Sequence, residues 1–259
     1  MQRRKIWDEE KKHDSKPNKQ RSVALVEQFH ISAAMPELCL PSNDEKTPCI
    51  TRRPVYLAST NMTTAAPTTK ERILDAAEEI MLQKSFHSVG LNEILSAVKV
   101  PKGSFYHYFQ SKEQFGVELL KHYVADASAY KRRAMLSTEL SENPYERLVT
   151  FLDMNVAKLF EQSCKCSCLV QKLASEVATF SDDMRAVLVE GMREWRGFLE
   201  KLIIEGQEKG VIRQELDPAA TASLLHDLLT GASQRCQLEH SVAPLRTAAL
   251  FIREYLKPA

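Results

Sequence analysis

Three cysteines at alternate positions, Cys164, Cys166 and Cys168, are the residues of this 259-residue chain with the most distinctive chemistry, and Cys236 follows later. The C-x-C-x-C run matches none of the common zinc-ligand spacings and has no histidine pair nearby, so we predict no metal site. The charged start of the chain holds no secretory signal, which argues against a framework of structural disulfides. Modification of a reactive thiol is the chemistry that this pattern leaves open.

Other residue types give no indication of catalysis. His122, His226 and His240 have no metal-ligand spacing, and we expect them to be packing or surface residues. The chain shows no Ser-His-Asp order, no Walker loop and no dinucleotide-binding glycine pattern. Trp195 is expected in the core, with a ligand cavity as the alternative. We therefore predict a protein that is not an enzyme and that needs no cofactor.

Composition favours a helical protein. Only 8 residues are glycine, 44% are hydrophobic and 27% are charged. No apolar run approaches the roughly 18 residues that a membrane span requires, so no membrane partner is expected. These features predict a soluble, cytoplasmic, all-α chain.

The chain divides into three regions that differ in composition and in hydrophobic periodicity. Residues 1–61 are broken by five prolines and lack periodicity, so we expect a disordered tail, or an extension that is absent if translation starts at Met62. Residues 62–112 begin with a capping box, Thr68 and Glu71, and show three short helical patterns. Three helices with a tight turn before the last one are typical of a helix-turn-helix domain. Residues 113–259 are helical throughout and are predicted to form a regulatory and dimerisation domain.

The third short helix, KGSFYHYFQS, has the residue types of a recognition helix. Phe105 and Phe109 have the spacing to pack inward, and Tyr106 and Tyr108 are left to contact phosphates or base edges. We expect Lys102, Ser104 and Lys112 to meet phosphates, and Gly103 to permit close approach of the backbone. From Lys99 to Lys112 the chain carries three lysines, one histidine and no acid. The alternative is an aromatic-rich core helix without a DNA role.

The segment VPKGSFYHYFQSKEQF, preceded by LNEILSAVK, resembles the N-terminal signature of the TetR family of bacterial transcriptional repressors. This resemblance implies a homodimer on a palindromic operator in double-stranded DNA, an inducer-binding domain, and dimerisation through the last two helices, at about 218–257. It also implies a DNA-facing set and a dimer surface. The DNA-facing set is Gly103, Ser104, Tyr106, His107, Tyr108 and Lys112, and the dimer candidates are Leu224, Leu225, Leu228, Leu229, Ala249 and Ile252. An intrachain core is the alternative for those two helices.

Within this family, the run CLVQKLASEV resembles the electrophile-sensing branch, also described as N-ethylmaleimide-responsive, which implies that Cys168 is a redox or electrophile sensor. A thiolate at a helix N-terminus is stabilised by the helix dipole, and Lys165 or Lys172 would add a cation. Cys164 and Cys166 are expected to be resolving thiols or bystanders, and a buried, inert Cys168 is the alternative.

The chain departs from the branch at one position. Where that branch carries a lysine in the penultimate helix, this chain has Gln237, beside Cys236. A partnership between the sensor cysteine and a lysine at that position is therefore in doubt. A disulfide between Cys168 and Cys236, or simple adduct formation, would replace it.

These observations predict a DNA-binding repressor that is released when a small electrophile or oxidant modifies its cysteines. A repressor with a noncovalent inducer is the alternative within the same class. A helical protein-interaction module that does not bind DNA is the alternative from another class.

Overall fold

The computed structural model describes residues 66–165, 168–177 and 179–258. The predicted tail 1–61 and Cys166 lie outside the described residues. Within this part of the chain all regular structure is helical, as predicted. In chain order the helices are α1 (Thr69–Met81), α2 (Leu91–Val98), α3 (Lys102–Tyr108), α4 (Lys112–Leu136), α5 (Pro144–Glu161), α6 (Leu169–Val177), α7 (Asp182–Glu208), α8 (Pro218–Glu239) and α9 (Ala243–Leu256).

Local side-chain caps begin several of these helices. The Thr68 hydroxyl accepts the Glu71 backbone N–H, and the Glu71 carboxylate accepts the Thr68 N–H at 2.7 Å, which confirms the predicted capping box. The Ser111 hydroxyl accepts the Gln114 N–H at 3.0 Å at the start of α4. Pro101, with an extended backbone, is the N-cap residue of α3.

The turn between α2 and α3 sets the direction of α3. Lys99 ends α2 in the left-handed conformation with φ 55°, and the Val100 N–H donates back to the Leu95 carbonyl at 3.0 Å. This is a Schellman-type helix end, in which glycine is the usual residue. The Arg72 guanidinium, on α1, donates to the Val98 carbonyl at 2.7 Å and so attaches the end of α2 to α1.

The three short helices do not have a core of their own. Their buried apolar side chains form one cluster with residues of α4, α6 and α7, so the helix-turn-helix head shares its core with the rest of the chain. Gly116 lies in this cluster, and a Cβ atom there would come within 2.8 Å of Phe86 and Met184. The buried members include Ile73, Leu74, Phe86, Phe105, Phe109, Phe115, Leu120, Leu169, Leu173 and Met184.

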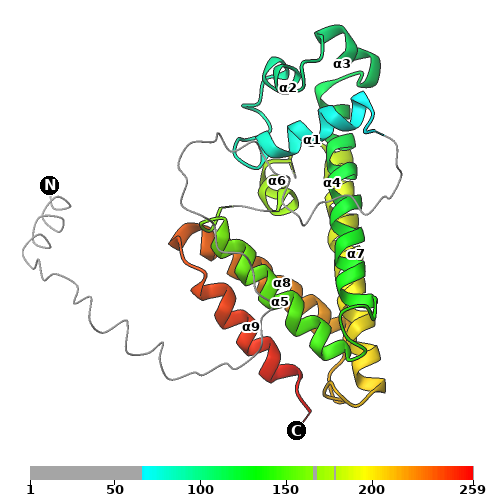
Figure 1. Cartoon of the computed structure of the whole chain (residues 1–259), viewed down its shortest axis with the longest axis vertical. Helices are drawn as coiled ribbons and strands as arrows, with labels where there is room; N and C mark the ends of the chain where they lie inside the picture. The colour runs from blue at the N-terminus through cyan, green and yellow to red at the C-terminus, as the bar shows by residue number, and fades with distance from the viewer. Residues whose placement is uncertain (1–65, 166–167, 178, 259) are drawn as a thin grey trace, which may run out of the picture. The chain divides into compact units, whose positions relative to one another are not determined.

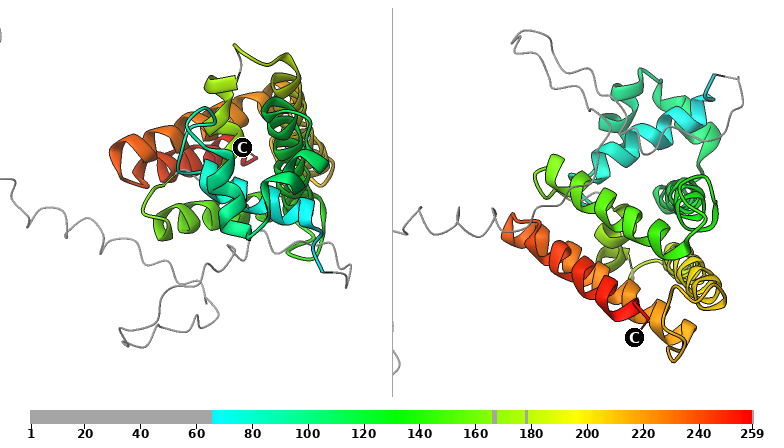
Figure 2. Two further views of the ribbon diagram at one scale, coloured as in Figure 1. Left: turned by 90° about the horizontal axis from the view of Figure 1, so that it is seen from above. Right: turned by 60° about the horizontal axis from the view of Figure 1, so that its bottom comes forward.

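Two further clusters fill the remainder. Helices α4 and α7 lie along each other (Figure 1), and at Gly191 a Cβ atom would come within 2.9 Å of Val124. The second cluster joins these helices to α5, α8 and α9. The third lies between the ends of α5, α8 and α9 and contains Cys164 and Cys236. Helices α8 and α9 lie side by side (Figure 2).

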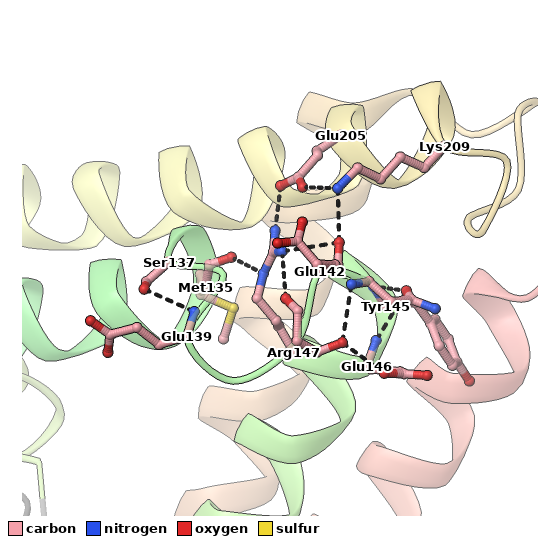
Figure 3. A network of polar contacts seen from close by, with 11 residues as sticks. Met135, Ser137, Glu139, Glu142, Tyr145, Glu146, Arg147, Glu205 and Lys209 are labelled. Atoms are coloured by element: carbon pink, nitrogen blue, oxygen red, sulfur yellow. Dashed lines mark hydrogen bonds and ion pairs between the residues drawn. The ribbon is translucent and has the colours of Figure 1, made fainter.

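A buried arginine joins the connection between α4 and α5 to the end of α7 (Figure 3). The Arg147 side chain is 0% exposed and forms an ion pair with Glu205. It also donates to the Met135 carbonyl at 2.9 Å and to the Ser141 carbonyl at 3.0 Å. Lys209 donates to the same Glu205 at 2.9 Å. These bonds satisfy a charge that burial alone would make costly.

Candidate nucleic-acid interface and regulatory cavity

Helix α3 presents two different faces. Phe105 and Phe109 are buried in the shared core, where their ring centroids lie 4.9 Å apart. Tyr106 is 58% exposed. Lys102, Gly103 and His107 are also exposed, while Ser104 and Tyr108 are half-buried. The structure thus places all six predicted residues of α3 on a helix whose two phenylalanines hold it against the core.

Lys112 has contacts within the chain. Its ammonium donates to the Val89 carbonyl at 3.0 Å and to the His87 carbonyl at 3.2 Å, and it lies 5.2 Å from the centre of the Phe86 ring. This lysine therefore holds the connection between α1 and α2 against the start of α4. Contact of Lys112 with a phosphate stays a prediction, and the intrachain role was not apparent from the sequence.

Cys168 lies directly before α6 and lines a cavity of about 220 Å³. Helices α4, α5, α6, α7 and α8 all contribute to its wall. Gln237, the residue at the position of the branch's lysine, lines the same cavity. Apolar and aromatic side chains, among them Val124, Phe151, Leu152, Val170, Met192 and Trp195, alternate with polar ones, among them Ser128, Asn155, Gln171, Thr230 and Ser233.

The other described cysteines occupy a different place. Cys164 and Cys236 are buried together in the third cluster, and burial raises the pKa of the Cys236 thiol, with a further contribution from Cys164. Cys168 packs against the first cluster instead. The structure thus places Cys236 with Cys164 in one cluster and Cys168 against another, and a disulfide between Cys168 and Cys236 stays a prediction.

The cations near Cys168 are not those expected from the sequence. Lys172 points to the Leu82 carbonyl, and Lys165 is exposed. The lysines that line the cavity are Lys131 on α4 and Lys158 on α5. Burial lowers the pKa of both ammonium groups, and the Cys168 sulfur acts in the opposite direction. Sequence reasoning missed them because no local pattern links two distant helices to Cys168.

Tyr123 completes the surroundings of Cys168. Its phenol is buried in the cavity wall. Burial raises the pKa of this phenol well above its ordinary value, and the neighbouring Cys168 sulfur raises it further. The hydroxyl is therefore a neutral hydrogen-bonding group at physiological pH.

Helix α6 connects the cavity to the head. The Lys172 ammonium donates to the Leu82 carbonyl, at the end of α1, at 2.9 Å. The Glu176 carboxylate accepts the Phe86 backbone N–H, in the connection that follows α1, at 2.7 Å. Two hydrogen bonds therefore attach α6 to the end of α1 and to the connection that follows it.

The predicted dimer residues divide into two groups. Leu225, Ala249 and Ile252 are at most 4% exposed within the chain's own second cluster, so their assignment to a dimer surface was wrong. They were candidates because an apolar stripe does not identify its partner. Leu224 is 46% exposed, and Leu228 and Leu229 are partly buried. Other large apolar side chains exposed on α8 and α9 are Leu238, Leu250 and Phe251.

In the described ranges, no group of three or more histidine, cysteine or acidic side chains is placed to hold a metal ion. Of the histidines, His122 is bound to Asp75 at 3.0 Å, between α4 and α1, and His226 lines the cavity. No helix in the described part of the chain is long and apolar enough to cross a bilayer.

Two protein families match this chain, one in the helix-turn-helix region and one in the C-terminal region. A family described as "Bacterial regulatory proteins, tetR family" matches residues 73–119, and one described as "Tetracyclin repressor-like, C-terminal domain" matches residues 144–252. The HTH-type transcriptional repressor NemR of Escherichia coli is 32% identical over 189 residues, which cover 73% of this chain and 94% of NemR. The transcriptional regulator AcuR of Cereibacter sphaeroides is 33% identical and covers 68% of this chain and 80% of its own length.

Solved structures agree with these matches. The crystal structure of the reduced form of E. coli NemR superimposes with a TM-score of 0.68 at 31% identity, over 74% of this chain and 100% of that one. A regulatory protein from Rhodobacter sphaeroides superimposes with a TM-score of 0.65 at 32% identity, over 71% of this chain and 97% of that one.

Proposed function

The chain belongs to the TetR family of bacterial transcriptional regulators, which are not enzymes, and we propose that it is a homodimeric repressor released from its operator by modification of Cys168. The observation that carries the proposal is the position of Cys168, in a cavity wall and at the start of the helix that is bonded to the DNA-binding head.

The exposed face of α3 supports DNA binding. A short helix held by Phe105 and Phe109, with exposed Lys102, Tyr106 and His107, has the form of a helix that enters the major groove. Two such heads in a dimer would read a palindrome whose half-sites lie about one helical turn apart, or somewhat more. Residues 62–112 would then be the DNA-binding domain, and residues 113–259 the regulatory and dimerisation domain.

The surroundings of Cys168 support a covalent trigger. A thiolate there would lie within electrostatic range of the Lys131 and Lys158 ammonium groups, and cations favour the nucleophilic form of a thiol. An adduct would add volume inside a cavity of about 220 Å³, directly before α6. An adduct that does not fit this space would shift α6, because the surrounding interior is close-packed, and would strain the bonds of α6 to Leu82 and Phe86.

The cavity itself favours a second candidate trigger, a noncovalent inducer. Its mixture of apolar walls and convergent polar groups is that of a ligand-binding site for a small organic molecule. Such a ligand would act by binding one head arrangement more tightly than the other.

Binding to the DNA upstream of the protein's own gene tests both triggers. We expect footprinting and fluorescence anisotropy to show protection of a palindrome, with binding that weakens steeply as salt rises. N-ethylmaleimide should release the wild type and the control Cys236→Ala, but not Cys168→Ser. A full response of Cys168→Ser would exclude the covalent trigger and favour the noncovalent one. Absence of salt-dependent DNA binding would instead favour a protein-interaction module.

A further inference from the structure

The cavity at Cys168 is lined by two lysines, Lys131 and Lys158, and by no aspartate or glutamate among the described residues. The carboxylates of Glu194 and Glu78 act electrostatically on Lys131 and Lys158, respectively, but neither is part of the wall. Glu194 is already bound by the Ser128 hydroxyl at 2.6 Å and by the Arg132 guanidinium at 3.0 Å. The wall is therefore positively charged where a ligand would contact it.

Of the two lysines, Lys131 gives the clearer indication of an anionic ligand. Its ammonium lies 4.9 Å from the centre of the Trp195 ring and, within the described residues, has neither a hydrogen-bond acceptor nor an ion-pair partner. Burial lowers the pKa of this ammonium, which expresses the cost of removing it from water. Its side chain is half-buried, and charges that are withdrawn from water in proteins are normally paired. An anionic group brought by a ligand would supply the partner that the chain does not.

We propose that this cavity selects small organic anions, and that the inducer is a carboxylate-bearing electrophile whose carboxylate is bound by Lys131 while its reactive carbon meets Cys168. This inference rests on the proposed function, whose trigger site it specifies. The cavity of about 220 Å³ is below the roughly 300–1,000 Å³ of sites for drug-sized ligands, which limits the ligand to a small molecule. The aromatic face of Trp195 and the apolar side chains would hold its hydrocarbon part.

The chemistry for an α,β-unsaturated carbonyl compound needs no oxidant. The Cys168 thiol loses its proton to solvent, and the thiolate forms a sulfur–carbon bond to the β-carbon. The electron pair of the carbon–carbon π bond moves to give an enolate, which takes a proton from water. Lys131 would act as a positioning residue, because it holds the carboxylate and leaves the reacting atoms to Cys168.

Three maleimides with the same reactive ring provide the test. We would compare N-(2-carboxyethyl)maleimide, N-ethylmaleimide and N-(2-aminoethyl)maleimide, which are anionic, neutral and cationic. Rates of Cys168 labelling would be measured by peptide mass spectrometry and divided by the rates with a free thiol. The Cys166→Ser background leaves one cysteine in the tryptic peptide 166–172. We expect the anionic reagent to react about tenfold faster than the neutral one, the effect of one hydrogen bond to a charged group, and the cationic one to be slowest.

Variants of Lys131 test whether this lysine causes the preference for the anionic reagent. Lys131→Gln should abolish it and Lys131→Arg should retain it. The matched control Lys201→Gln removes the same charge from an exposed position on α7 outside the cavity and should behave as the wild type. Equal normalised rates for all three reagents in the wild type would overturn the inference, although release by N-ethylmaleimide would still support the proposed repressor.

An unreactive ligand separates the anion site from the covalent trigger. In Cys168→Ser, N-(2-carboxyethyl)succinimide should raise the melting temperature more than N-ethylsuccinimide does, and Lys131→Gln should remove the difference. That result, together with unlabelled Cys168 in the maleimide series, would support the anion site and overturn the covalent trigger. The absence of any stabilisation by the anion, with no charge preference in labelling, would overturn the anion site.

Discussion

The Lys172 ammonium lies 2.9 Å from the carbonyl oxygen of Leu82, so the first turn of α6 is bonded to the end of α1. The backbone N–H of Lys172 donates at 3.1 Å to the carbonyl of Cys168, one turn earlier. The residue proposed as the trigger is therefore two hydrogen bonds away from the DNA-binding head. This path couples the two sites only if Cys168 modification and operator binding both change the position of α6.

Removing this bond should weaken the coupling. Modification of Cys168 should raise the operator dissociation constant, and the ratio of the modified to the unmodified constant measures the coupling. In Lys172→Met we expect this ratio to fall by about tenfold, because a hydrogen bond from a charged group is lost. If the wild-type ratio is below about ten, it should fall to unity. Fluorescence anisotropy measures both constants. Lys165→Met, at an exposed position before α6, is the control. An unchanged ratio in Lys172→Met would show that α6 transmits the signal by another route.

Tyr106 should affect DNA affinity without affecting stability. Since its side chain is 58% exposed, Tyr106→Ala should weaken operator binding by about 1–3 kcal/mol and change the free energy of unfolding by less than about 0.5 kcal/mol. Phe105→Ala, on the buried face, should instead destabilise the protein by about 3–5 kcal/mol. Anisotropy and urea denaturation distinguish the two. Unaltered operator affinity in Tyr106→Ala would remove this residue from the DNA-facing set.

Lys102 should contribute to the salt dependence of DNA binding. Each phosphate contact adds about 0.9 to the slope of log affinity against log salt concentration, so Lys102→Gln in a dimer should lower the slope by about 2. Anisotropy titrations at several salt concentrations give the slope. The control Lys201→Gln, on α7, should leave it unchanged. If both variants changed the slope equally, the effect would come from net charge and not from a contact.

The Arg147 network should be important for stability. Arg147→Leu removes a fully buried charge, leaves Glu205 without its arginine and leaves the carbonyls of Met135 and Ser141 without their donor. We expect a loss of about 3–5 kcal/mol in the free energy of unfolding, measured by urea denaturation. Arg133→Leu breaks an exposed ion pair with Glu139 and should cost no more than about 1 kcal/mol. Similar losses in the two variants would contradict this account.

The pair of His122 and Asp75 should make stability depend on pH. The hydrogen bond that His122 donates to the Asp75 carboxylate raises the pKa of His122, burial opposes this shift, and the charge of Asp126 adds to it. The stabilisation that this pair gives the folded protein is therefore fully present below the ordinary histidine pKa of about 6.5. It is lost as pH rises through the raised pKa that His122 has in the folded state.

Urea denaturation at several pH values tests this pair. The free energy of unfolding should be higher in the wild type than in His122→Gln, and this difference should be larger at about pH 5.5 than at about pH 8.5. Asp75→Asn should remove the same pH dependence. A stability difference between wild type and His122→Gln that grows with rising pH would reverse the assigned sign.

Much of the helical organisation could be predicted from local signals. The capping box at Thr68 and the spacing of Phe105 and Phe109 act within a few residues, so they predicted the start of α1 and the buried face of the recognition helix. Helix ends without such signals were less certain. Helix α8, for example, ends at Glu239, where His240 takes up the left-handed conformation.

The composition of the candidate site could not be predicted in the same way. From the sequence, Lys165 and Lys172 were the cations near Cys168, since they are its neighbours along the chain. In the folded chain Lys131 and Lys158 line the cavity, and Lys172 faces Leu82. Sequence distance is a poor guide here because residues of α4 and α5 reach the cavity at Cys168 only through long-range packing.

The sequence by itself determined the helices and the character of the recognition helix, and its resemblance to known regulators singled out Cys168, because caps, periodicity and motifs are local properties of the chain. Only the tertiary structure decided which thiol lines the cavity, which lysines surround it and which apolar stripes are already buried. These depend on contacts between helices far apart in sequence, whose free energies come from burial and charge pairing in the assembled core.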